Sequence, residues 1–119
     1  WNVEGPSYME LHKLYEEQYT ALAEVIDEIA ERIRTIGHYA EGRLKELLKL
    51  ASLEEPVVPT RFEKQIPNLD ADHETIINNL RKLIRDFDEK YKDIGSSDFA
   101  TGLLKQHEKM AWMLRSYVG

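Results

Sequence analysis

Several features that often direct a function are missing from this chain of 119 residues. It has no cysteine, which excludes disulfide bonds, thiolate metal sites and a cysteine nucleophile, and which fits a cytoplasmic protein. No apolar run approaches the roughly 20 residues of a transmembrane helix, so we expect no membrane contact. The start at Trp1, Asn2 and Glu4 also lacks the basic and apolar character of a signal peptide.

Positive charge is also scarce. The chain has 16 Lys and Arg against 22 Asp and Glu, which gives a net charge of −6. This sign is wrong for electrostatic binding to nucleic acid or to an acidic membrane. The hydrophobic content of 42% and charged content of 32% are ordinary for a globular protein. We therefore expect a single domain over residues 1–119 with one hydrophobic core.

Helical periodicity runs along the chain and no segment alternates with period two, so we predict an all-α fold. A long helix is predicted to begin at a capping box of Ser7 and Glu10, after the turn at Gly5-Pro6, and to reach Ile36 before Gly37. A short amphipathic helix is predicted over 42–51, followed by a loop over 53–59. The next helix is predicted to run from a capping box of Thr60 and Glu63 to Ile94, with a kink or restart at Pro67. A last helix is predicted to be capped by Ser97 or Asp98.

The long helix carries a polar stripe with the composition of a metal site. His12 and Glu16 are spaced i, i+4, and so are Asp27 and Glu31. At about 100° per residue, all four lie within roughly 100° of one another on the helix surface. One imidazole and three carboxylates suit iron, manganese or zinc. The neighbouring stripe is the predicted core face, formed by Leu11, Leu14, Leu22, Val25, Ile26, Ile29, Ile33 and Ile36.

The two pairs cannot bind one ion within a single chain. His12 and Asp27 are separated by about 22 Å along the helix axis at 1.5 Å per residue. An antiparallel copy of the helix, related by a two-fold axis, would bring the first pair of one chain against the second pair of the other, twice. Ala23 and Ala30 lie on the same stripe and would allow the close approach. A solvated polar flank remains the alternative, because this spacing of acids is common in helices.

The residues around this stripe resemble a known family. The segment from Trp1 to Gly37, WNVEGPSYMELHKLYEEQYTALAEVIDEIAERIRTIG, is similar to the Dps mini-ferritins, which show W-N-V-x-G-P, then L-H, then D-E-I-A-E-R around a ferroxidase centre. The segment from His107 to Ser116, HEKMAWMLRS, is similar to the family's last helix. The resemblance implies a ferritin-like four-helix bundle with a short extra helix in its long crossover. It also implies a hollow dodecamer that oxidises Fe(II), preferably with hydrogen peroxide, and stores ferric iron, protecting against oxidative damage.

The resemblance assigns roles to individual residues. His12 and Glu16 of one subunit, with Asp27 and Glu31 of its two-fold mate, would bind iron as Fe2+/Fe3+ and form the catalytic centre. Glu16 stands where family members often carry the shorter Asp. Trp1 would lie beside the iron, behind its ligands. From the sequence alone, Trp1 is an aromatic residue at the chain end that packs on the bundle, and the two interpretations are compatible.

Other polar residues have less specific interpretations. Asp98 corresponds to an acidic position of the family's three-fold pore, where it would attract Fe(II), but an N-cap of the last helix explains it equally well. His38 follows Gly37 and is expected in a loop. His73 and His107 lack a His at ligand spacing, so we expect them at the surface or between helices.

One part of the family pattern lies outside residues 1–119. In the family a long first helix precedes the W-N-V segment, and its last residue is a His that binds iron. That helix and that His are absent from this sequence, so we expect the domain to be incomplete at its N-terminus. A fourth helix, supplied by residues preceding Trp1 or by another chain, is expected to fill the groove left by the other three.

Two other functions remain open at this stage. The first is non-specific DNA binding by a nucleoid protein, and the second is a helical scaffold without catalysis, disabled by loss of the first helix. DNA binding in the family belongs to members with a Lys-rich terminal tail, and residues 1–119 contain no such tail. We therefore expect weak or absent DNA binding and a cytoplasmic protein, with nucleoid association as the alternative.

Overall fold

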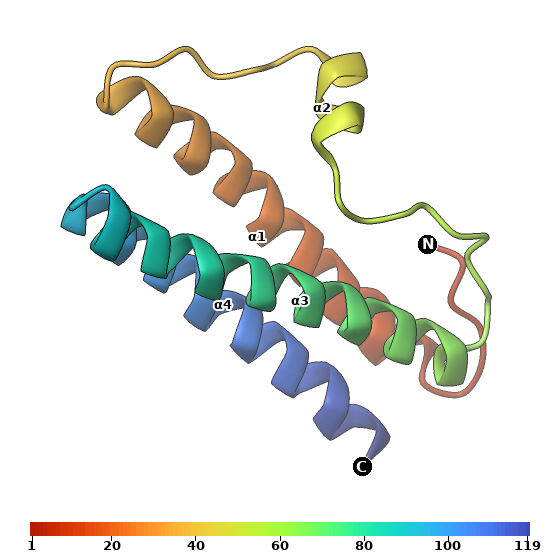
Figure 1. Ribbon diagram of the computed structural model, residues 1–119. Helices are drawn as coiled ribbons and strands as arrows, with labels where there is room; N and C mark the ends of the chain where they lie inside the picture. The colour runs from red at the N-terminus through yellow and green to blue at the C-terminus, as the bar shows by residue number, and fades with distance from the viewer. The chain divides into compact units, whose positions relative to one another are not determined.

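The computed structural model describes residues 1–119 and consists of helices and loops, which confirms the predicted all-α class (Figure 1). The elements are α1 (Tyr8–Thr35), α2 (Leu44–Leu50), α3 (Phe62–Arg85), a π-helical segment η1 (Asp86–Lys90) and α4 (Ile94–Val118). They belong to two compact units, one formed by Met9–Val57 and the other by Trp1–Tyr8 with Val58–Gly119. No helix combines the length and apolar character required to cross a membrane.

The long helix α1 forms almost as predicted, and its C-terminal end has a clear local cause. Gly37 adopts a left-handed conformation with φ of 95°. Its N–H donates to the Arg34 carbonyl at 3.0 Å, and the His38 N–H donates to the Ile33 carbonyl at 3.1 Å. These two bonds form a Schellman motif, which satisfies carbonyls that the helix end would otherwise leave unpaired.

The predicted core face of α1 is only partly buried. Leu11 and Val25 are buried, but Ile26 is 68% exposed, and Ile29 and Ile36 are also exposed. The prediction of one continuous core face is therefore wrong for these isoleucines. Periodicity identifies the apolar side of a helix, but it does not show how far a neighbouring surface covers that side. The polar Gln18 is buried within the same stripe and was not anticipated.

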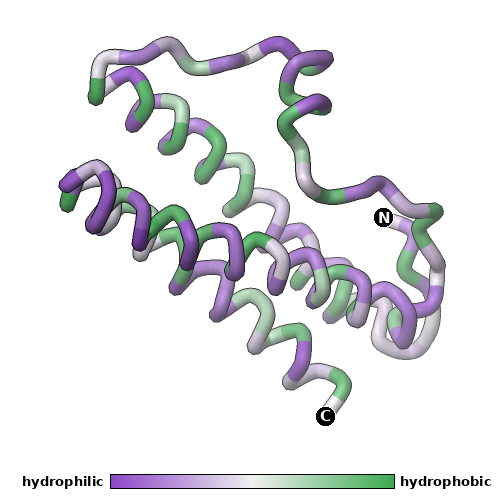
Figure 2. Tube along the Cα trace, viewed as in Figure 1, coloured by the Kyte–Doolittle hydropathy of each residue, from purple (hydrophilic) through white to green (hydrophobic).

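The short helix α2 lies inside the predicted range 42–51 and contains no buried residue. The Ala51 N–H donates to the Leu47 carbonyl at 3.0 Å and closes its last turn. Its leucines are all exposed: Leu44, Leu47, Leu48 and Leu50. Figure 2 shows apolar and polar positions alternating along this short segment. α2 is therefore amphipathic, and its apolar face is uncovered in the single chain.

α3 and α4 form an antiparallel pair within the second unit (Figure 1). Near one end the rings of Phe62 and Tyr117 meet edge to face with centroids 5.9 Å apart, and towards the other Arg81 forms an ion pair with Glu108 at 3.1 Å. The buried apolar side chains of the two helices are Ile66, Ile77, Leu80, Ala100, Leu103, Met110, Ala111 and Leu114. Burial of a large aliphatic side chain contributes about 1.5–3 kcal/mol. This apolar contact is the main stabilising interaction of the pair.

The N-terminal end of α3 differs from the prediction. Its N-cap is Arg61, whose side chain makes no capping hydrogen bond, so the predicted Thr60–Glu63 capping box is wrong. α3 also continues through Pro67 without restarting. A proline close to a helix start removes only one backbone hydrogen bond. The neighbouring Ile66 is 1% exposed, and its burial favours a continuous helix at this point.

The connection to α4 is tighter than the sequence suggested. α3 passes into η1, in which the Tyr91 N–H donates to the Asp86 carbonyl at 3.0 Å, and Lys92 then adopts a positive φ of 53°. α4 starts at Ile94, so the predicted helix end at Ile94 and the predicted cap at Ser97 or Asp98 are wrong. The N-cap is Asp93, whose carboxylate accepts a bond from the Ser96 N–H at 2.9 Å.

The capping assignment can be tested by comparing two aspartates. Asp93→Ala is expected to lower the free energy of unfolding by about 0.5–2 kcal/mol, because the first turn of α4 loses its side-chain acceptor. Asp98→Ala removes the same group from an exposed position and is expected to change it by less than about 0.5 kcal/mol. Urea unfolding followed by circular dichroism measures both values. Equal losses in the two variants would contradict the assignment.

Candidate metal centre

The four predicted metal ligands all lie on α1, which is unbroken from Tyr8 to Thr35. The continuous helix confirms that His12 and Glu16 are one turn apart on one side, as are Asp27 and Glu31. Glu16, Asp27 and Glu31 are exposed, whereas His12 is half-buried. The three carboxylates are thus accessible to a second molecule.

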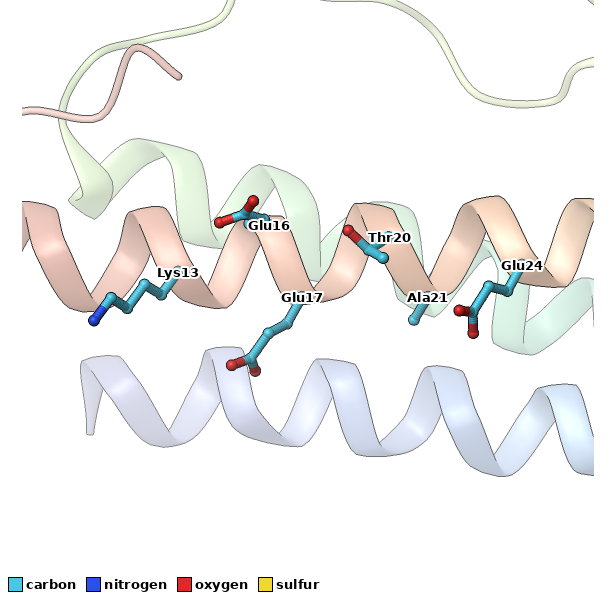
Figure 3. Close-up of a pocket in the computed structure, with 6 residues that line it drawn as sticks. All are labelled: Lys13, Glu16, Glu17, Thr20, Ala21 and Glu24. Atoms are coloured by element: carbon cyan, nitrogen blue, oxygen red, sulfur yellow. The ribbon is translucent and has the colours of Figure 1, made fainter.

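The surface of α1 between the two pairs is shallowly hollowed. One depression is lined by Lys13, Glu16, Glu17, Thr20, Ala21 and Glu24, and the next by Thr20, Ala23, Glu24, Asp27 and Glu28. Figure 3 shows that Glu16 and Glu17 project from different sides of the helix. The two depressions share Thr20 and Glu24, so together they extend from Glu16 to Asp27, the first two carboxylates of the predicted site.

No single chain completes the site. Nowhere in the structure do three or more His, Asp or Glu side chains gather in a way that could hold an ion. The separation of about 22 Å between His12 and Asp27 is fixed by the helical rise. Each pair thus offers two donors, and an ion that prefers four or more ligands needs donors from elsewhere.

Two other predicted site residues lie in the second unit. Trp1 is 90% exposed, so the interpretation of Trp1 as an aromatic residue packed on the bundle is wrong in this structure. In the segment that follows Trp1, Val3 is buried. The next residue, Glu4, donates its N–H to the Thr60 carbonyl at 2.9 Å. Asp98 lies exposed in the first turns of α4 and does not cap it.

The sequence did not predict that two buried histidines of different helices contact each other. His73 of α3 and His107 of α4 are 3% and 5% exposed, and their Nδ1 atoms are 2.9 Å apart. The expectation of an interhelical position is therefore confirmed. Burial lowers the pKa of both imidazoles, and the charge of His73 lowers the pKa of His107 further. The only sequence signal was that each His falls on the apolar side of its own helix.

Comparison with known proteins places the chain in a family. The model of the ferritin-like domain matches residues 1–119. An uncharacterised low temperature-induced protein of Nostoc is 45% identical over 120 residues, which cover 99% of this chain and 66% of that protein. This chain thus spans a little under two-thirds of that relative's length. A DNA protection during starvation protein 2 of Bacillus anthracis is 36% identical, with 99% of this chain and 80% of that protein covered.

Solved structures agree with this assignment. The crystal structure of the Dps protein from Vibrio cholerae, described as a member of a broad superfamily of ferritin-like diiron-carboxylate proteins, is 28% identical with a TM-score of 0.91. It matches 100% of this chain, and the match covers 74% of the Vibrio chain. The predicted ferritin-like fold is therefore confirmed. The chain belongs to the ferritin-like family and, within it, to the Dps mini-ferritins.

Proposed function

We propose that this protein binds Fe(II) and oxidises it at sites formed between two copies of the chain. His12 and Glu16 of one copy would face Asp27 and Glu31 of its two-fold mate, so that each pair of chains holds two sites. The observation that carries the proposal is the placement of all four donors on one stripe of the unbroken helix α1. Two half-sites on a rigid helix become complete only when the helix meets its antiparallel copy.

The proposed donor set suits iron oxidation. Three carboxylates supply hard oxygen ligands, which favour Fe(III) over Fe(II), and the imidazole adds one nitrogen. Iron is the substrate here, and hydrogen peroxide is the proposed oxidant. Reduction of one peroxide to two waters would take one electron from each of two Fe(II) ions together with two protons, and it would avoid the one-electron step that releases hydroxyl radical. The diiron-carboxylate description of the Vibrio relative supports this chemistry.

Assembly of several copies is the second part of the proposal. α1 and α2 leave large apolar side chains uncovered in the single chain, including Ile26, Leu44 and Leu50. Leu44, Leu47 and Leu48 share one face of α2 and expose a contiguous apolar surface there, which is characteristic of protein interfaces. We infer two-fold dimers that assemble further into a hollow shell, a dodecamer as in the family, in which ferric iron is stored. Asp98, exposed on α4, is the proposed residue of an entry pore.

Mixing of inactive variants tests whether the sites lie between chains. Asp27→Ala and His12→Ala should each abolish tight binding of Fe(II), or of redox-inert Zn(II), measured by anaerobic calorimetry. After joint unfolding and reassembly, a mixed dimer keeps one whole site, so about a quarter of the sites should return with random pairing.

The matched control combines Asp27→Ala with Glu31→Ala, which lie in the same half-site. No mixed dimer of these two variants contains an intact site, so no binding should return. If the first mixture recovers nothing although each variant is folded and dimeric, the intersubunit site is refuted.

Neighbouring glutamates provide a test within one helical turn. Glu16→Ala is expected to lower the initial rate of Fe(II) oxidation by peroxide at least about tenfold, since it removes a charged oxygen ligand from the reacting ion. Glu17→Ala should leave the rate within about twofold, because this side chain projects from another side of α1 (Figure 3). Stopped-flow absorbance of ferric iron measures both rates. Equal effects of the two substitutions on the rate would show that negative charge on the helix, and not iron binding by Glu16, controls the oxidation.

DNA binding is expected to be weak, although the Bacillus relative is named for DNA protection. With a net charge of −6, these 119 residues can neutralise few phosphates. An electrophoretic mobility assay at about 150 mM salt should show no stable complex with duplex DNA. A complex that persists at this salt concentration and neutral pH would reveal a basic surface on the assembled protein.

A further inference from the structure

A pair of buried histidines joins α3 to α4. The Nδ1 atoms of His73 and His107 are 2.9 Å apart, and the ring centroids are 5.2 Å apart with the planes tilted by 57°. The side chains come from positions 34 residues apart, so the contact is tertiary. The proposed ferroxidase chemistry uses neither residue.

We propose that the His73–His107 pair is a proton-sensitive latch between α3 and α4, closed while both rings are neutral, still hydrogen-bonded but carrying a buried charge after one added proton, and broken by a second. A distance of 2.9 Å between two nitrogens is that of a hydrogen bond, which requires one Nδ1 to carry hydrogen and the other to offer its lone pair. Two neutral rings of complementary tautomers meet this requirement.

The chemistry of protonation explains the two stages. The first proton can be added at the outer nitrogen, Nε2, of the donor ring, so the Nδ1–H···Nδ1 bond survives but a charge is now buried. The second proton must go to the acceptor's Nδ1, because its Nε2 already carries hydrogen. Both Nδ1 atoms are then donors and the bond is lost. Two positive charges at this distance also repel each other strongly in a poorly hydrated environment.

The charges around the latch set its response. On α3, the acidic residues Asp70, Asp72 and Glu74 favour protonation of His73, which opposes the effect of burial on its pKa. On α4, Arg115 forms ion pairs with Asp70 at 2.8 Å and with Glu74 at 3.0 Å, and thereby offsets part of the acidic influence.

The next ion pair along the two helices joins Arg81 to Glu108 at 3.1 Å and adds one charge of each sign. Burial remains the first cause of the lowered pKa of each histidine. The neutral pair is thus the form that the surrounding helices favour.

The pH window follows from this direction. An unfolded histidine has a pKa of about 6.5. With both folded pKa values lowered, the native chain binds fewer protons than the unfolded chain in the range below this value. The contribution of the neutral pair to the free energy of unfolding is therefore complete above about pH 6.5, and it is lost as the pH decreases through the folded pKa values. α3 and α4 should then separate more easily in mild acid.

A metal ion explains the geometry less well. Two nitrogens alone are too few ligands for zinc or iron, and no third His, Asp or Glu completes a metal-binding group. A two-coordinate ion would hold the nitrogens on opposite sides of itself, clearly further apart than the 2.9 Å found here.

The test compares urea unfolding of the protein at about pH 7.5 and pH 5.0, on either side of the ordinary histidine pKa. The double variant His73→Asn/His107→Asn places amides near the Nδ1 positions and cannot titrate. On acidification the unfolding constant of the unmodified protein should rise at least about tenfold more than that of the double variant, which corresponds to one pKa unit. His38→Asn, which removes an exposed loop histidine, should behave like the unmodified protein.

A second measurement decides the matter if the double variant does not fold. Proton NMR titration of the unmodified protein should show His73 and His107 titrating below the ordinary histidine pKa of about 6.5, in two coupled steps. Titration of both residues at the ordinary histidine pKa, or equal acid sensitivity of the unmodified protein and the double variant, would overturn the proposal. So would stoichiometric Zn(II) binding at neutral pH that is lost in the double variant but kept in His12→Ala, because it would identify a metal site instead.

Discussion

A continuous α-helix fixes the height and direction of every side chain it carries, and this constraint governs what α1 can do. Side chains one turn apart can share an ion, whereas those separated by four turns cannot. In the proposed metal centre, the stripe of α1 therefore contributes two half-sites rather than one site. Neither bending nor rotation of side chains can close a gap of about 22 Å. Any function that needs all four donors must come from a second copy of the helix.

Exposure of the carboxylates of α1 agrees with the proposed role in iron binding between chains. Glu16, Asp27 and Glu31 are exposed on the single chain. If they formed a complete site within one chain, their carboxylates would converge and would be shielded from water. Their open arrangement instead resembles one half of an interface that becomes buried on association. The uncovered apolar side chains of α1 and α2 support the same interpretation.

The α3–α4 pair depends on a different balance. Its apolar contact is interrupted at one level by two imidazoles that bond to each other. A buried polar pair stabilises less than an apolar pair of the same shape, but an unsatisfied one would cost considerably more. The hydrogen bond between the rings therefore offsets the cost of burying them. It also places a titratable group inside the α3–α4 interface. The long helices thus differ in their polar groups, with the proposed iron ligands on α1 and a titratable contact between α3 and α4.

Features that depend on neighbours within one or two helical turns could be predicted from the amino-acid sequence. The all-α class, the end of α1 at Gly37, the short α2 and the grouping of His12 with Glu16 and of Asp27 with Glu31 all follow from local spacing. The Dps family could also be recognised from the sequence, because its motifs are short and local. The cap of α4 is also a local feature, but the predicted cap at Ser97 or Asp98 lies inside the helix, whose N-cap is Asp93.

The remaining features depend on packing between residues that are far apart in the chain. Continuity of α3 through Pro67 accompanies the burial of Ile66, and the partial burial of the apolar face of α1 depends on which surfaces lie against it. The contact of His73 with His107 joins residues 34 apart, a separation at which no helical periodicity relates two side chains. Periodicity shows which side of a helix is apolar, but the partner on that side is chosen by packing of the whole chain, which no local pattern encodes.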